Sequence, residues 1–176
     1  SLQATMIGLL ASRVNHLVAG VSIDGAGSRY ESDTELARLT DDRGTAGSGV
    51  LDSGAAVRLR SDVRHLGLYA ADFWSLSPRI TLMGAARFTH STVDLLDQVD
   101  DDLTGTHVFS RVDPSAGVTF ELGRGVSAFG SIAMASRVPA PSELSCADPE
   151  DPCRLPNAFV ADPPLDPVVA RTWEGG

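Results

Sequence analysis

The two cysteines, Cys146 and Cys153, have six residues between them, including Pro149 and Pro152. In an oxidising compartment this spacing favours a disulfide that closes and stiffens a small loop. Free thiols and a metal site are the alternatives. A zinc site lacks a nearby nitrogen ligand, because the histidines are scattered along the chain. They are His16, His65, His90 and His107. A disulfide here would indicate a cell-envelope protein.

A run of three carboxylates, Asp100, Asp101 and Asp102, is the second group that could do chemistry. Hard divalent cations bind clustered oxygens, so this run is a candidate cation or extracellular ligand site. The alternative is an acidic loop that is simply solvated. The run has no glycine-bearing ligand loop around it. We therefore predict no metal site and no cofactor.

Catalytic signals are weak. His90 and Ser91 are adjacent, but neighbours on a strand point to opposite faces and cannot act together. The chain has no Gly-x-Ser-x-Gly elbow and no phosphate-binding loop. We therefore expect that the protein is not an enzyme.

Charge excludes another class. The 176 residues carry 14 arginines, no lysine and 23 acids, for a net charge of -9. A nucleic-acid-binding domain of this size normally has the opposite balance. No apolar run approaches a membrane helix, and residues 1–30 show no signal peptide.

The elements that would position these residues are strands. Apolar and polar residues alternate with period two, for example in residues 79–90 and 115–122. Gly and polar clusters separate the alternating segments. The pattern predicts an all-β chain of about seven strands: residues 2–10, 16–28, 64–75, 79–96, 109–122, 126–137 and one starting near Val169.

Short and long connections alternate strictly between these strands. The short ones are residues 11–15, 76–78 and 123–125, and the long ones are residues 29–63, 97–108 and 138–168. The long connections hold 17 of the 23 acids but only six of the 14 arginines. A transmembrane β-barrel has this organisation, with short periplasmic turns and long extracellular loops, whereas a soluble sandwich has no reason for it.

Five segments, read in order, resemble the β-barrel of TonB-dependent outer-membrane receptors. They are residues 68–78, 84–88, 113–118, 137–144 and 165–176, the last as a Leu-x-Pro piece and an aromatic-Glu-x-Gly piece. The residues that carry the resemblance are Tyr69, Asp72, Trp74, Gly84, Arg87, Pro114, Gly117, Arg137, Pro139, Glu143, Leu144, Leu165, Pro167, Glu174 and Gly176.

This resemblance implies that residues 1–176 are part of an antiparallel transmembrane β-barrel, without the plug domain and the closing strands. It implies a multi-pass protein of the Gram-negative outer membrane, in contact with lipid and lipopolysaccharide. The parent would take up a scarce nutrient, most often a metal chelate such as a ferric siderophore, with energy from the TonB complex acting through the plug. A soluble or secreted β-rich ligand-binding module is the alternative.

Within such a barrel, the arginines Arg79, Arg87, Arg111 and Arg137 are candidates for the polar lumen. For Arg87 and Arg137 we favour a structural ion pair over substrate contact. Tyr69, Phe73 and Trp74 precede a short turn and fit an interfacial aromatic girdle, with a soluble core as the alternative.

Overall fold

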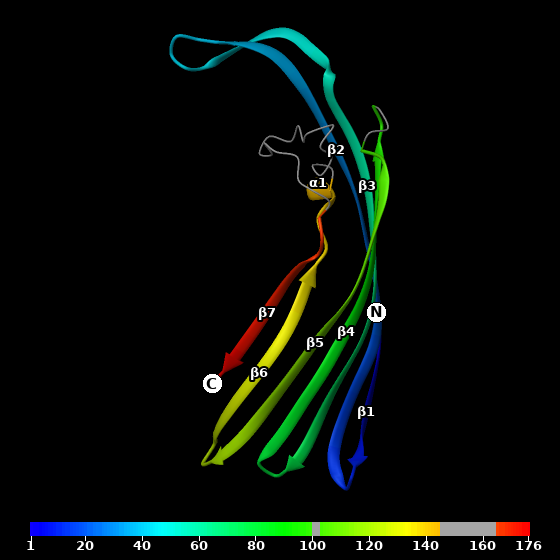
Figure 1. The fold of residues 1–176 in the computed structure, drawn as a ribbon, viewed down its shortest axis with the longest axis vertical. Coiled ribbons are helices and arrows are strands. Elements are labelled where there is room, and N and C mark those ends of the chain that lie inside the picture. The colour runs from blue at the N-terminus through cyan, green and yellow to red at the C-terminus, as the bar shows by residue number, and fades with distance from the viewer. Residues whose placement is uncertain (100–102, 145–164) are drawn as a thin grey trace.

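The computed structural model describes residues 1–99, 103–144 and 165–176. Seven strands in chain order form one antiparallel sheet in which each strand pairs with the next. Their bounds are β1 Leu2–Leu10, β2 Arg13–Leu39, β3 Thr45–Ser77, β4 Ile80–Asp97, β5 Gly105–Gly123, β6 Val126–Arg137 and β7 Val168–Gly175, with one short helix, α1 Pro141–Leu144. In this chain the sheet is open, and β1 and β7 form its edges (Figure 1).

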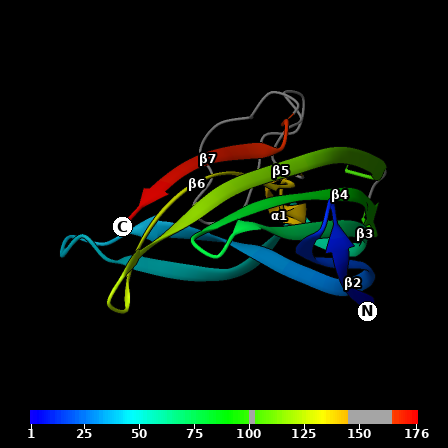
Figure 2. The ribbon, with the colours of Figure 1, turned by 90° about the horizontal axis from the view of Figure 1, so that it is seen from below.

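The sheet is bowed and twisted, as strands of L-residues require. Figure 2, seen from the end of the short turns, shows this curvature. Three tight turns lie together at that end, and α1 lies toward the opposite end of β6 (Figure 1). Two of these turns depend on left-handed backbone, with φ of 50° at Ala11, 61° at Ser12 and 57° at Arg124. None of the described helices has the length and apolar character needed to cross a membrane.

The predicted all-β class and the strands β1 and β6 are confirmed. The predicted long connection over residues 29–63 is wrong. There β2 and β3 continue as a paired hairpin to Leu39 and Thr45, with bulges between Ser32/Thr34 and Glu35/Ala37, and only residues 40–44 turn. Figure 1 shows this hairpin arching beyond the other strands. The period-two signal disappears in the outer part of this hairpin because residues 33–39 and 47–54 are exposed on both faces, whereas the backbone ladder persists.

The sheet has two different faces. In β5 the odd-numbered residues from 105 to 119 are half-buried and the even-numbered ones are exposed. We call the face with the odd residues of β5 the inner face and the other the outer face. The pairing extends these faces to the other strands, so that Leu59, Val93 and Leu95 lie on the inner face. Together with Leu144 of α1 they form the buried hydrophobic cluster.

The part of the outer face nearest the short turns is largely apolar and exposed, whereas Asp62, Arg64 and Asp94 lie on the outer face further from the turns. Met6, Leu68, Leu82, Val112 and Phe120 all lie on the outer face, each at least 36% exposed. A soluble protein rarely leaves such a continuous apolar surface to water, whereas a lipid-facing barrel wall requires one.

Candidate functional site

A row of residues in register crosses the inner face from β1 to β5. Gln3 pairs with Gly20, Gly20 with Tyr69, Tyr69 with Arg87 and Arg87 with Asp113. We call these five residues the inner row. Tyr69 Oη donates to Gln3 Oε1 at 2.8 Å, and Arg87 Cζ lies 6.0 Å from the centre of the Tyr69 ring. At this distance the guanidinium gains from the electron-rich face of the ring.

Two glycines make room for the large side chains of this row. A Cβ at Gly20 would lie 2.5 Å from Tyr69 Cζ and 2.7 Å from the carbonyl oxygen of Leu2. A Cβ at Gly67 would lie 2.6 Å from Ser22 Oγ and 2.9 Å from Arg87 Cζ. Glycine within a strand often marks such a close approach.

Arg87 therefore lies flat along the sheet. Its Nη2 donates to Ser22 Oγ at 2.9 Å and its Nε donates to Thr89 Oγ1 at 3.3 Å. Among the described residues it has no ion pair. Its charge is thus held by hydroxyl and aromatic groups, and the side chain remains exposed on the inner face.

Next to the row, Arg111 and Asp113 lie two residues apart on β5, with Arg111 Nε 3.8 Å from Asp113 Oδ1. Ser136 of β6 donates to Asp113 Oδ2 at 2.6 Å, beyond the last β5–β6 pair at Ser115 and Ala133. Arg111 Nε and Asp113 Oδ1 are themselves buried without a hydrogen bond to any described residue. Buried polar atoms normally have a partner, so these two atoms are an unusual feature of the inner face.

A cavity of about 240 Å³ lies beside this pair. Its walls include His65, Ser91, Arg111, Arg137 and Pro167, and His65 Nδ1 lies 2.7 Å from Ser91 Oγ. Cavities that enclose whole ligands of drug size are larger, about 300–1,000 Å³. This one fits a single side chain or a small anion.

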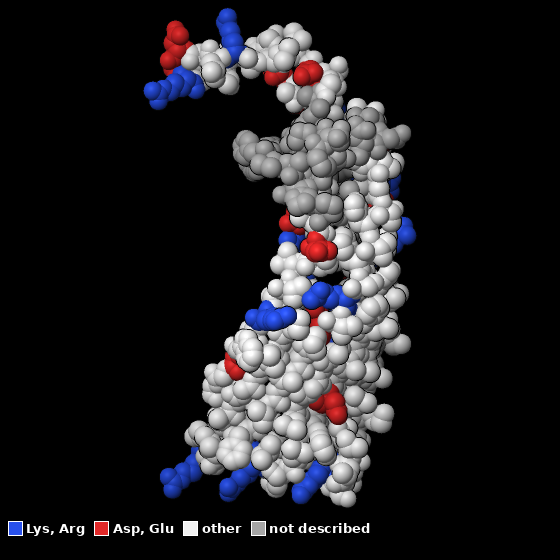
Figure 3. All heavy atoms as spheres, viewed as in Figure 1, with Lys and Arg blue, Asp and Glu red and all other residues white. Residues whose placement is uncertain are grey.

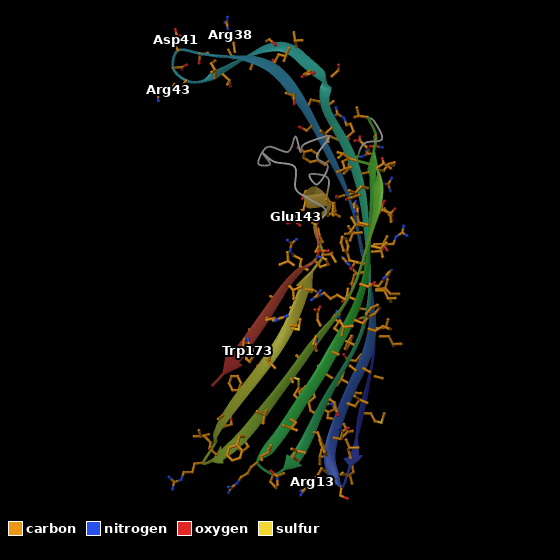
Figure 4. All side chains as sticks on the ribbon, in the orientation of Figure 1. Arg13, Arg38, Asp41, Arg43, Glu143 and Trp173 are labelled. Carbon is orange, nitrogen blue, oxygen red and sulfur yellow. The ribbon has the colours of Figure 1, made fainter. Side chains whose placement is uncertain are left out.

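The segment that follows β6 forms a corner held by one ion pair. Arg137 Nη1 and Nη2 each donate to Glu143 at 2.9 Å, and the Ala140 amide donates to the same carboxylate at 2.6 Å. These bonds, chiefly those from Arg137, lower the pKa of Glu143 to about 2. Leu144 then inserts into the buried cluster, and Pro139 is buried. Figure 4 labels Glu143 beside α1.

The four predicted lumen arginines lie in three different places. Arg87 and Arg111 lie on the inner face in register with neighbouring strands. Arg137 reaches Glu143 at the corner and lines the cavity. Arg79 does not belong with them, because it is exposed in the turn between β3 and β4. The alternating pattern of β4 includes Arg79, but the strand begins one residue later, at Ile80.

The predicted aromatic girdle is also only partly right. Trp74 pairs with Leu82 on the outer face, and its Nε1 donates to the Leu10 carbonyl at 3.2 Å. Tyr69 and Phe73 pair with Arg87 and Met83, so they lie on the inner face. Phe73 there contacts His16, with ring centres 6.1 Å apart.

The remaining motif residues occupy defined places. Asp72 lies on the outer face and accepts a hydrogen bond from Asn15 at 2.5 Å, and Gly84 and Pro114 also lie on that face. Gly117 lies on the inner face, where a Cβ would contact the Gly130 carbonyl oxygen at 3.4 Å. Leu165 and Pro167 lead into β7, Glu174 pairs with Ser131, and Gly176 exchanges backbone bonds with Phe129.

Cys146, Cys153 and Asp100, Asp101 and Asp102 lie outside the described residues. Within the described part of the chain no group of three or more His, Cys, Asp and Glu residues could hold a metal ion. Sequence reasoning missed Gln3, Gly20, Ser22, Gly67 and Ser136. Only the two glycines gave a signal, as interruptions within alternating strands.

Figure 3 shows how charge is distributed on one side of the molecule. Basic and acidic atoms gather at mid-height, next to a hollow, and at the tip of the long hairpin, and basic atoms recur at the short-turn end. Between mid-height and the short-turn end most of the surface in this view is uncharged, with a few acidic atoms.

A family model described as TonB dependent receptor-like, beta-barrel matches residues 7–176. A comparison with curated proteins found no match to the chain. The family match covers the last four residues of β1 and all of β2 to β7.

Proposed function

This chain belongs to the TonB-dependent receptor β-barrel family, whose members transport nutrients across the outer membrane, and from this premise we propose that its parent takes up a ferric siderophore. Residues 1–176 form part of the barrel wall in this proposal. The observation that carries the assignment to the barrel wall is the contrast between an exposed apolar outer face and an inner face with a polar row.

The outer face supports contact with lipid and lipopolysaccharide. Its exposed apolar residues alternate with inner residues along β4 and β5, as in a strand with lipid on one side and a polar lumen on the other. The hairpin of β2 and β3 extends beyond this apolar zone on the side opposite the short turns (Figure 1). It would stand on the extracellular side.

The inner face supports contact with a plug domain rather than capture of the whole nutrient. Its cavity is about 240 Å³, and the exposed Arg87 with the unsatisfied atoms of Arg111 and Asp113 could accept polar side chains. In this proposal the plug fills the barrel, couples it to the TonB complex and closes the binding site from below. Loops and plug together would then select the substrate, and Asp100, Asp101 and Asp102 and the Cys146–Cys153 disulfide remain proposed features of the loops.

The test is uptake by cells in which the full-length protein is the only receptor of its kind. We expect accumulation of iron-55 from at least one ferric siderophore, and loss of that accumulation when the proton gradient is collapsed or TonB is removed. Uptake of cobalamin, haem or a carbohydrate instead would overturn the siderophore proposal and keep the transport role. Recovery of the full-length protein in a soluble fraction would overturn both.

A further inference from the structure

The short turns share a feature that the transport role does not require. Each described hairpin at this end has one arginine in or next to its turn: Arg13 is the first residue of β2, Arg79 lies in the β3–β4 turn and Arg124 lies in the β5–β6 turn. All three side chains are exposed. We call these three residues the rim arginines. We infer that the rim arginines bind the phosphate groups of anionic phospholipids in the periplasmic leaflet, an inference that rests on the proposed place of the chain in the outer membrane.

The spacing of the rim arginines suits separate lipid molecules. Neighbouring strands are about 4.8 Å apart, so the turns of adjacent hairpins are about 10 Å apart along the rim. The order β1 to β6 in the sheet places the three turns side by side. Figure 4 labels Arg13 at this end, and Figure 3 shows basic atoms along the same edge.

The depth of the rim arginines also fits a headgroup. Just inside the turns the outer face carries Leu10, Leu82 and Leu122, which are exposed, and Trp74. An aromatic residue next to such an apolar band marks the boundary between hydrocarbon and headgroups. Arg13 pairs with Leu10 at the edge of this band, and Arg124 lies two residues beyond Leu122, so each guanidinium is placed to reach the phosphate level with its apolar stem over the band.

Nothing in the described part of the chain neutralises the rim arginines. None of their guanidinium groups has a hydrogen bond or ion pair there. Asp72 accepts a hydrogen bond from Asn15, and Glu121, whose amide donates to the Arg79 carbonyl at 2.8 Å, lies opposite Arg79 without forming an ion pair with it. Guanidinium binds phosphate through two parallel hydrogen bonds, which favours arginine over lysine for this role.

The turns hold the arginines with little freedom to retract. Arg124 stands between Gly123 and Gly125, all three with positive φ, and Arg79 follows Pro78 directly. The tight turns keep the backbone of Arg79 and Arg124 at the ends of their hairpins, and Arg13 pairs with Leu10 at the first position of β2.

The experiment uses the full-length protein reconstituted into vesicles of phosphatidylcholine with or without phosphatidylglycerol. Brominated lipids of either headgroup quench tryptophans at the lipid boundary, so quenching reports the relative affinity for the two lipids. We expect a preference for phosphatidylglycerol that falls by about fivefold for each arginine replaced at low ionic strength, as R13Q, R79Q and R124Q are combined. Addition of inorganic phosphate at the concentration of the lipid headgroups should leave it unchanged.

The matched control replaces Arg38 and Arg43 with glutamine at the tip of the β2–β3 hairpin, which Figure 4 places at the other end of the molecule. It removes two charges and should keep the preference. Equal quenching by both lipids in the unmodified protein, an unchanged preference in the triple variant, or loss of the preference with free phosphate would overturn the inference alone. Failure to insert into either vesicle would overturn the proposed membrane location, and the inference with it.

Discussion

Gly20 and Gly84 show how one residue type serves two purposes at the residue scale. Gly20 lies under the Tyr69 ring, and a Cβ there would also approach the backbone of β1. Gly84 lies on the outer face, where a Cβ would meet nothing within 4 Å. The Leu2 carbonyl oxygen cannot move away as the end of a side chain could. A methyl group added at Gly20 should therefore destabilise the fold, whereas one added at Gly84 should not.

We therefore expect Gly20→Ala to destabilise the folded barrel by about 1–3 kcal/mol, because overpacking forces the tyrosine off Gln3. Gly84→Ala, the matched control, should change the free energy of unfolding by less than about 0.5 kcal/mol. Urea unfolding of the full-length protein in vesicles measures both. Equal effects of the two substitutions would show that the close approach at Gly20 is unimportant.

The corner of Arg137 and Glu143 gives a prediction about pH. Since the folded pKa of Glu143 is about 2, below its value in an unfolded chain, the ion pair stabilises the corner fully above about pH 5. That stabilisation is lost as the pH falls toward 2. The carboxylate side chain is 41% exposed, so solvent screening reduces the contribution to about 1 kcal/mol or less.

Protease cleavage in residues 137–144 is the suitable readout, because it reports the corner rather than the whole barrel. We expect cleavage to accelerate from pH 6 to pH 3 in the unmodified protein, measured with an acid-stable protease and normalised to a denatured standard. Arg137→Gln should be cleaved quickly at both pH values. Glu121→Gln, which changes an exposed carboxylate with no described ion pair, should be cleaved as the unmodified protein is. A cleavage rate that does not change with pH in the unmodified protein would contradict the role of Glu143.

At the scale of elements, the β2–β3 hairpin is the main departure from sequence expectation. Ser32 pairs with Val57 across it, far beyond the strand ends that the alternation predicts. Cysteines at paired positions have Cα atoms about 4.5–5.5 Å apart, within the range of a disulfide.

We expect Ser32→Cys with Val57→Cys to cross-link rapidly on mild oxidation, in a background where Cys146 and Cys153 are serine. Ser32→Cys with Asp62→Cys is the control, since Asp62 pairs with Gly27, five residues from Ser32, which separates the sites by about 16 Å along the strand. Mass spectrometry of the digested protein identifies the product. Similar yields for both pairs would indicate a flexible loop and would contradict the pairing of β2 with β3 in this hairpin.

At the scale of the whole molecule, the two faces of the sheet must meet different surroundings. Phe88 on the outer face and Thr89 on the inner face are neighbours in β4, so they share strand, depth and backbone environment. They differ only in the side of the wall to which they point.

We expect Phe88→Arg to destabilise the full-length barrel in vesicles by about 1–4 kcal/mol, because a charge within the lipid-facing apolar band is poorly solvated. Thr89→Arg should cost much less, since the inner face already holds Arg87 and Arg111. Urea titration of the refolded protein gives both values. The reverse order would mean that the inner and outer faces are assigned the wrong way round.

The sequence by itself determined the strand class and the three tight turns. These follow from local chemistry: period-two patterning appears wherever one face is apolar, and Pro78 and the glycines around Arg124 punctuate it. The same local logic failed over residues 29–63, because residues 33–39 and 47–54 are exposed on both faces and show no apolar alternation, while the backbone pairing continues.

Only the tertiary structure decided which residues meet. Gln3 and Asp113 belong to one row because the register of four strand pairs adds up across the sheet, and a slip of one residue in any pair would send a member to the other face. Tyr69 and Trp74 lie on opposite faces for the same reason, since one is an odd-numbered and the other an even-numbered residue of β3. Register depends on pairing between residues distant in the chain, and no local pattern encodes it.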